Sequence, residues 1–379
     1  MGRGCARVLI VKLPQMDYKG RQQRLRIALT VERLDAILIT HLPNVRYLCG
    51  FSGSAAVLLL TEKDAVLFTD GRYTQQARAE VHGTRTIIVR KAPLASAGEW
   101  LVRNQNGRRA LRFNVGMEAE HLTVAARNRF AGILPSHLRL REAPPLTERL
   151  RMVKDADEIK EIRAAVLLGA TLFDRALEII RPGVKETEVA GAIEYAARKA
   201  GAQEMSFSTI IASGKRSALP HGRASQSHLP TRGFVVCDFG VILTGYCSDM
   251  TRTVHLGRPS GKTSSIYRAV EEAQQAAIEA VTAGVSVSEV DRAARKSLGK
   301  KHLAKYFTHS TGHGVGLEIH EAPRVAAGQT EILQPGMVIT IEPGVYIPGK
   351  CGVRIEDMVA VTARGCEVFT PTRKDLIAI

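Results

Sequence analysis

Four carboxylates, placed as two facing pairs, are the residues whose types and spacing suggest chemistry. The segment 234–254 (FVVCDFGVILTGYCSDMTRTV) holds two apolar runs separated near Leu243–Gly245, a pattern typical of a β-hairpin. A turn there predicts that Asp238 and Asp249 lie opposite each other on one face. Two like charges about 5 Å apart repel each other and destabilise a sheet, so we expect a cation between them.

A second hairpin repeats this arrangement. Residues 338–361 (VITIEPGVYIPGKCGVRIEDMVAV) form two more apolar runs that break at Pro348–Lys350, which places Glu342 opposite Glu356. A single aspartate pair is often explained by turns, but facing carboxylates in two separate hairpins are not. Four carboxylates in an apolar sheet are unfavourable unless cations neutralise them. These residues therefore predict a metal site.

Histidines in two glycine-containing loops precede the hairpins. His221 lies in ASGKRSALPHG before the first hairpin, and the loop THSTGHGVGLEIHE before the second contains His309, His313 and His320. A lone histidine is usually structural. Three within twelve residues, just before a carboxylate hairpin, indicate a catalytic or metal-binding region.

The carboxyl-terminal part of the chain looks internally duplicated. The segments RPGVKETEVA (181–190) and TAGVSVSEVD (282–291) resemble each other, and the two hairpins follow in the same order. In each copy we expect a helix to end at the glycine, Gly183 or Gly284, and another to follow. A pseudo-two-fold pair of halves would bring the two hairpins together at its axis.

Two domains are expected from the length and from a change of pattern along the chain. The chain has 379 residues, of which 45% are hydrophobic, enough for about two cores. Strands alternate with helices over residues 16–145, which is typical of an α/β domain, and residues 1–15 are expected to be a loose extension. Pro144–Pro145 and the charged stretch after them mark the boundary. A long helix, Ala156–Ile180, should follow in a second domain at 150–379.

The first domain allows more detailed expectations. Trp100 is expected to pack in its core. We expect helices at 18–34, 73–80 and 96–105, strands at 36–40, 56–60, 65–69 and 86–89, and a loop at 41–54.

The net charge of +16 is concentrated in the first domain. Residues 1–150 hold 24 Lys+Arg against 12 Asp+Glu, a net charge of +12. These basic residues are scattered, without a dense run, an RNA-binding aromatic motif or a zinc-finger spacing. A solvated basic surface explains them, so a nucleic-acid partner is not expected.

Cysteine spacing and hydropathy bear on location. The six cysteines form no CxxC pair or disulfide-like pattern, which favours a reducing compartment. No run approaches the roughly 18 apolar residues of a membrane span. We therefore expect a cytoplasmic protein with no membrane partner.

Five positions and three motifs together resemble a known family. The positions are Asp238, Asp249, His313, Glu342 and Glu356, and the motifs are TGHGVGLEIHE, IEPGVY and GVRIED. They are similar to those of the metallopeptidases with the pita-bread fold, which include aminopeptidase P, prolidase and methionine aminopeptidase. The resemblance covers about the last 230 residues of the 379. Methionine aminopeptidases lack a preceding α/β domain of the creatinase type, so the Xaa-Pro branch is the better match.

This resemblance implies a fold. An α/β amino-terminal domain of the creatinase type would be followed by an α+β pita-bread (creatinase/aminopeptidase) catalytic domain with internal pseudo-two-fold duplication.

The donor set favours two metal ions. Four carboxylates and one imidazole suit Mn²⁺, and also Co²⁺, Fe²⁺ or Zn²⁺. Five protein ligands are too many for one catalytic ion, whereas two ions about 3.5–4 Å apart, bridged by carboxylates and a water, use them all. The resemblance implies that Asp249 and Glu356 bridge the ions, that Asp238 completes one, and that His313 with Glu342 completes the other.

Further roles are implied by the resemblance. Glu342 would pass a proton from the nucleophilic water to the leaving amine. His221 and His320 would steady the substrate carbonyl, and His309 would line the pocket for the residue after the scissile bond. Arg354 shares the strand face of the last ligand, and it either pairs with a carboxylate or holds a group on the proline side.

The expected activity is hydrolysis of Xaa-Pro bonds, at peptide amino termini or in dipeptides, by a homodimer. Both aminopeptidase P and prolidase fit the motifs. Two other classes stay open. A creatinase-like amidinohydrolase shares the fold but works without metals and usually lacks several of the carboxylates. A non-catalytic binding protein on the same scaffold is supported only by the basic first domain.

Overall fold

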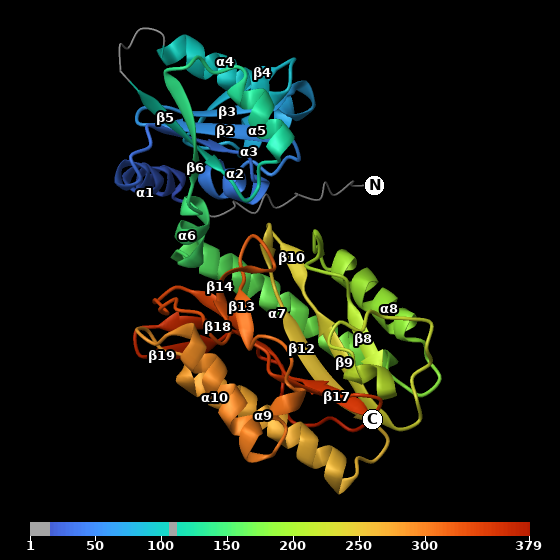
Figure 1. Cartoon of the computed structure of the whole chain (residues 1–379). Coiled ribbons are helices and arrows are strands. Elements are labelled where there is room, and N and C mark those ends of the chain that lie inside the picture. The colour runs from blue at the N-terminus through green and yellow to red at the C-terminus, as the bar shows by residue number, and fades with distance from the viewer. Residues whose placement is uncertain (1–15, 106–111) are drawn as a thin grey trace, which may run out of the picture.

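The computed structural model describes residues 16–105 and 112–379, which form two lobes joined by a short helix, α6 (Figure 1). The extension expected at 1–15 lies outside the described residues. The helices are α1 (Tyr18–Val31), α2 (Leu42–Cys49), α3 (Thr74–Glu80), α4 (Pro93–Gln105), α5 (Val124–Ala131), α6 (Leu146–Met152), α7 (Ala156–Ile179), α8 (Glu186–Lys199), α9 (Gly261–Ala280) and α10 (Val287–Lys300).

The first lobe is an α/β domain, as predicted. Its described strands are β1 (Ala36–Ile39), β2 (Ala56–Thr61), β3 (Ala65–Asp70), β4 (Arg85–Val89), β5 (Phe113–Glu118) and β6 (Leu138–Ala143), in the order β4-β3-β2-β1-β5-β6. Successive side chains of the central strands point into two different cores. Ile37 belongs to one core and its neighbour Leu38 to the other, which also contains Trp100. Both faces of this sheet are covered, and for that reason β1 is apolar throughout.

The expected loop at 41–54 was wrong, because most of it forms α2. Pro43 occupies the first turn of this helix, where its missing N–H would have had no partner. Gly50, with φ of +86°, ends the helix in the left-handed conformation. The proline and glycine therefore mark the two ends of a helix rather than a loop.

Two half-structures form the second lobe. Its strands are β7 (Glu204–Met205), β8 (Ile210–Ser213), β9 (Gly233–Phe239), β10 (Val241–Leu243), β11 (Tyr246–Cys247), β12 (Met250–Leu256), β13 (Gly312–Gly314), β14 (Glu321–Val325), β15 (Val338–Ile341), β16 (Gly344–Ile347), β17 (Cys351–Arg354), β18 (Asp357–Thr362) and β19 (Gly365–Val368). In the first half, α7 and α8 pack on β8, β9 and β12. In the second half, α9 and α10 lie side by side and pack on β15 to β18 (Figure 1).

The turn between the two helices is built in the same way in both halves. Gly183 N–H donates to Leu229 O at 2.9 Å, and Gly284 N–H donates to Leu333 O at 2.9 Å. The two glycines have φ of +84° and +88°, a conformation that suits glycine. Helices α7 and α9 end before these glycines rather than at them. The repeated hydrogen bond supports the predicted duplication.

Two other expectations can be compared with the structure. No helix in the described part of the chain has the length and apolar character needed to cross a membrane. The described cysteines are all free thiols.

Candidate metal centre

The first carboxylate hairpin has a register two residues away from the expected one. Strands β9 and β12 are antiparallel, and Asp238 lies opposite Thr251 instead of Asp249. The reason is a two-residue turn at Thr244 and Gly245, whose φ angles of +50° and +87° fit the type I′ hairpin turn. A shift of two residues keeps each side chain on its face. Asp238 and Asp249 consequently still line the same cavity.

The second hairpin has the expected register. Gly344 pairs with Arg354 across β16 and β17, and Ile341 pairs with Asp357 across β15 and β18. Between these two ladders, Glu342 and Glu356 lie opposite each other where the pairing is interrupted. Their backbone N–H groups donate to neighbouring segments instead, to Thr311 O at 2.8 Å and Thr251 O at 3.1 Å. These bonds fix both glutamates at the break.

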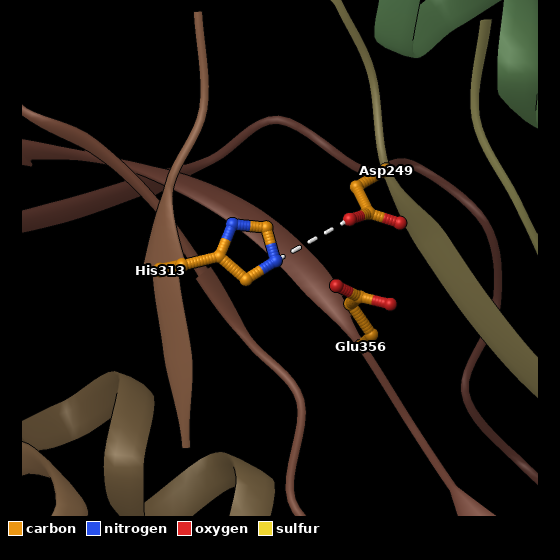
Figure 2. A group of neighbouring side chains, drawn as sticks. All are labelled: Asp249, His313 and Glu356. Atoms are coloured by element: carbon orange, nitrogen blue, oxygen red, sulfur yellow. Dashed lines mark ion pairs between the residues drawn. The ribbon is translucent and has the colours of Figure 1, made fainter. Parts of the chain in front are cut away.

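The predicted metal-binding side chains all line one cavity of about 840 Å³. Ligand atoms of Asp249, His313 and Glu356 all lie within 4.8 Å of one another. Figure 2 shows these three side chains pointing toward one another from separate segments of the chain. His313 Nε2 is 3.6 Å from Asp249 Oδ2 and 3.5 Å from Glu342 Oε1. Asp238 lines the same cavity.

Three buried oxygens of this cluster lack a hydrogen-bond partner, and they fit the cations that the sequence predicts. They are Asp238 Oδ1, Asp249 Oδ1 and Glu356 Oε1. An unpaired carboxylate oxygen in a dry site is costly unless a cation binds it. Burial, together with the charge of Glu356, raises the pKa of Asp249 well above its ordinary value. Burial also raises the pKa of Glu342 to about 7 and that of Glu356 well above its ordinary value.

His313 is held in the tautomer that suits a metal ligand. Its Nδ1 lies 3.0 Å from Gly314 O, so this nitrogen carries the proton and donates it. Burial lowers the pKa of His313, which favours the neutral ring. The lone pair of Nε2 is then directed at the carboxylates, as a divalent ion requires.

Arg354 is the cation that partly balances the four carboxylates. Its guanidinium is buried, and Nη2 pairs with Asp238. Nε donates to Thr251 Oγ1 at 3.0 Å, and this hydroxyl in turn donates to Glu356 Oε2 at 2.7 Å. Arg354 therefore holds two of the predicted ligands in place. Of the two roles expected for it, the contact with a carboxylate is the one observed.

The remaining predicted histidines also line the cavity. His309 Nε2 is 2.9 Å from the hydroxyl of Tyr346, which accepts a hydrogen bond from Arg354 Nη1 at 2.7 Å. Burial lowers the pKa of His309 to about 3, so its ring stays neutral and accepts from Tyr346. His320 packs edge-on against His313, with ring centroids 4.3 Å apart, and His221 lies on the cavity wall.

Sequence analysis missed two residues that hold this centre together. Thr251 follows Asp249 by two residues, so strand alternation alone could have placed it on the same face. Tyr346 closes the motif IEPGVY, but nothing in its spacing predicts a bond to Arg354. Other residues that line the cavity, such as Phe207, Arg223 and Arg324, also carried no signal in the sequence.

Comparison with known families matches both lobes. Residues 160–363 match metallopeptidase family M24, and residues 21–153 match the creatinase/prolidase N-terminal domain. Together the two matches span most of the chain.

Several relatives and solved structures are similar along nearly their whole length. The Xaa-Pro dipeptidase of Pyrococcus horikoshii is 37% identical over 348 residues, which is 91% of this chain and 95% of the relative. The structure of the Xaa-Pro dipeptidase from Bacillus anthracis superposes with a TM-score of 0.90 at 39% identity, covering 96% of this chain and 100% of the other. The structure of the X-Pro aminopeptidase from Thermotoga maritima superposes with a TM-score of 0.86 at 33% identity, covering 95% of this chain and 100% of the other.

Proposed function

This chain belongs to metallopeptidase family M24, with a creatinase/prolidase amino-terminal domain, and we propose from this premise that it hydrolyses the bond before proline in short peptides. It is a peptidase that depends on divalent metal ions. The observation that carries the proposal is the convergence of three partnerless buried carboxylate oxygens with His313 in one large cavity. Neither an amidinohydrolase without metals nor a binding protein would need these oxygens left free.

The proposed centre holds two ions. Asp249 and Glu356 would be ligands of both ions, Asp238 would complete one site, and His313 with Glu342 would complete the other. The oxygen-rich donor set suits Mn²⁺ and accepts Co²⁺, Fe²⁺ or Zn²⁺. When bound, such a pair supplies Lewis acidity and activates a water molecule near neutral pH.

The side chains then have separate tasks. Glu342, whose pKa is raised by burial to about 7, takes a proton from the attacking water and returns it to the departing amine nitrogen. The water oxygen bonds to the carbonyl carbon as the C–N bond breaks. His320 and His221 donate hydrogen bonds to the carbonyl oxygen as it gains negative charge. His309 lines the pocket for the residue after the cleaved bond.

Dipeptides with proline in the second position are the substrates best supported by the relatives. The relatives from Pyrococcus horikoshii and Bacillus anthracis are named Xaa-Pro dipeptidases. Longer peptides with proline in the second position are the second candidate, because the Thermotoga maritima neighbour is named an X-Pro aminopeptidase. The two candidates differ in the length of the leaving product.

The Mn²⁺-loaded protein should cleave Ala-Pro with a kcat/KM more than about tenfold above that for Ala-Ala, since a shaped pocket discriminates to this extent. Product amines are quantified by chromatography, with Ala-Pro-Ala as the longer substrate. Faster cleavage of Ala-Pro than of Ala-Pro-Ala assigns a dipeptidase, and the reverse assigns an aminopeptidase. Equal or absent turnover of the proline substrates contradicts the proposal.

Metal affinity should fall as the pH decreases from 8 to 6. A carboxyl with a pKa of about 7 is mostly ionised at pH 8 and mostly protonated at pH 6, and the proton competes with the metal. Glu342 alone should weaken the affinity for Mn²⁺ by about tenfold over this range. Asp249 and Glu356, whose pKa values are also raised by burial, add to the effect. Titration against a chelator calibrated at each pH measures the change, and an affinity that is constant or rises on acidification contradicts it.

The homodimer, the cytoplasmic location and the identity of the metal as manganese stay predictions. Sedimentation velocity of the purified chain tests the first, and elemental analysis of protein purified without added metal tests the last.

A further inference from the structure

Two buried cations lie on the connection between the lobes. Arg151, in the last turn of α6, and Lys154, just after it, are both nearly inaccessible to solvent. Arg151 Nη2 pairs with Glu318 at 2.8 Å and with Glu321, and Lys154 Nζ lies 2.7 Å from Glu321 Oε1. Both cations therefore converge on one loop of the catalytic lobe.

That loop carries His320. Residues 315–320 connect β13, which bears His313, to β14, which begins at Glu321, and Gly314 pairs with Glu321 where they leave the sheet. The Glu321 carboxylate lies against the loop backbone, since a Cβ at Gly316 would be 2.4 Å from its Oε1. His320 and Glu321 both line the cavity, and the side chain of Glu321 also pairs with the buried cations.

One of these cations, Arg151, is also tied to the first lobe. Arg151 Nη1 donates to Asn44 Oδ1 at 2.8 Å. The amide nitrogen of Asn44 donates to Glu118 and Glu148, each at 2.6 Å. Asn44 is buried in α2 and Glu118 ends β5, so the arginine is fixed by two rigid elements. An unbroken chain of hydrogen bonds thus leads from the core of the first lobe to the base of the His320 loop.

We propose that Arg151 is a positioning residue, which with Lys154 and Glu321 holds the loop 315–320 so that His320 faces the substrate carbonyl. The inference rests on the proposed function only for the role of His320. A displacement of about 1 Å of a catalytic group lowers the rate by up to roughly 10²-fold. Because the loop 315–320 contains no helix or strand, ion pairs at its base are needed to hold His320 in position.

Arg21 provides a matched control. It is also buried, and it pairs across the lobes with Asp155 at 2.7 Å and Glu158 at 3.2 Å. Among the described residues, its hydrogen bonds and ion pairs do not reach the His320 loop. Arg151→Met and Arg21→Met should both weaken the contact between the lobes. Only Arg151→Met should release the loop.

The first measurement compares hydrogen exchange of full-length variants in Mn²⁺. The amides of Val315 and Gly316 are hydrogen bonded, to Val338 O and Glu318 O, both at 3.1 Å. In peptides covering 315–322, Arg151→Met should exchange at least about tenfold faster than Arg21→Met. Equal exchange in the two variants overturns the proposal, and this comparison holds even if the wild type cleaves no proline peptide.

The second measurement uses kinetics. For Arg151→Met, kcat for Ala-Pro should fall by about 10- to 100-fold with KM changed less than about threefold, and Arg151→Lys should recover part of the loss. Arg21→Met should stay within about threefold of wild type. In a His320→Ala background, Arg151→Met should lower kcat by less than about threefold more, because its effect passes through His320. If Arg151→Met lowers kcat by about a further 10- to 100-fold in the His320→Ala background, the proposal is overturned.

A second variant, which changes no charge, tests the proposal even if Arg151→Met does not fold. Gly316→Ala forces the Glu321 carboxylate away from the loop backbone. It should show the same faster exchange at 315–322 and the same loss of kcat. Unchanged exchange and kcat in Gly316→Ala count against the anchor.

Discussion

Glu356→Gln should lower kcat/KM for Ala-Pro by more than about 10³-fold, because it removes a carboxylate that both metal ions are proposed to share. One oxygen of Glu356 accepts from Thr251, and the other is buried without a partner. In the variant, an amide NH₂ takes one of these places, where a cation would meet a donor instead of a negative oxygen.

The same variant should bind fewer metal ions. Elemental analysis after dialysis should find about two ions per wild-type chain and one or none in Glu356→Gln. Glu367→Gln is the matched control, since Glu367 lies on β19 and forms an exposed ion pair with Arg163. A Glu356→Gln protein that hydrolyses at the wild-type rate, or that keeps two ions, would refute the assignment of this centre.

The second large effect concerns stability without metal. Arg354→Met should lower the free energy of unfolding of the metal-free protein by about 3–5 kcal/mol, the usual cost of leaving a buried charge without its partner. Arg354 pairs with Asp238 and is close to Glu342 and Glu356, whose charges it opposes. In the variant, the three buried carboxylates and the partly buried Glu342 would lie together with no arginine among them.

Divalent ions should reverse most of this loss. Urea unfolding measures the free energy of unfolding of each protein in EDTA and in excess Mn²⁺. The difference between Arg354→Met and wild type should be smaller in Mn²⁺, because bound metal ions then neutralise the carboxylates in place of the arginine. Arg163→Met, which breaks an exposed pair, should cost only about 0–1 kcal/mol in either condition. A deficit for Arg354→Met that is as large in Mn²⁺ as in EDTA would show that the arginine does not balance the metal ligands.

Strand alternation explains why the sequence predicted so much of the centre. The first hairpin was placed two residues out of register, yet Asp238 and Asp249 kept their common face because side chains alternate with a period of two. The second register was right because Pro348–Lys350 marks its turn. Strand alternation and turn residues therefore predict which face of a hairpin the acidic side chains occupy, without any knowledge of the tertiary fold.

What the sequence did not predict depends on partners far apart in the chain. Arg151 meets Glu321 across 170 positions, and nothing in the sequence indicated this pair. Contact with a carboxylate was one of the two roles expected for Arg354, but the sequence did not indicate that the carboxylate would be that of Asp238, 116 positions away. No periodicity links residues at such separations, so only the folded structure reveals these two pairs. Helix α2 was missed for a local reason, since Pro43 breaks a strand or a helix interior but is tolerated in a first turn.

The interrupted second hairpin has a consequence for how the protein matures. Glu356 is fixed by a backbone bond to Thr251 in the opposite half, and the proposed ligands are divided between the halves, with Asp238 and Asp249 from one and His313, Glu342 and Glu356 from the other. We therefore expect that neither half alone would retain the ions against a chelator, and that metal binding would follow the docking of the two halves.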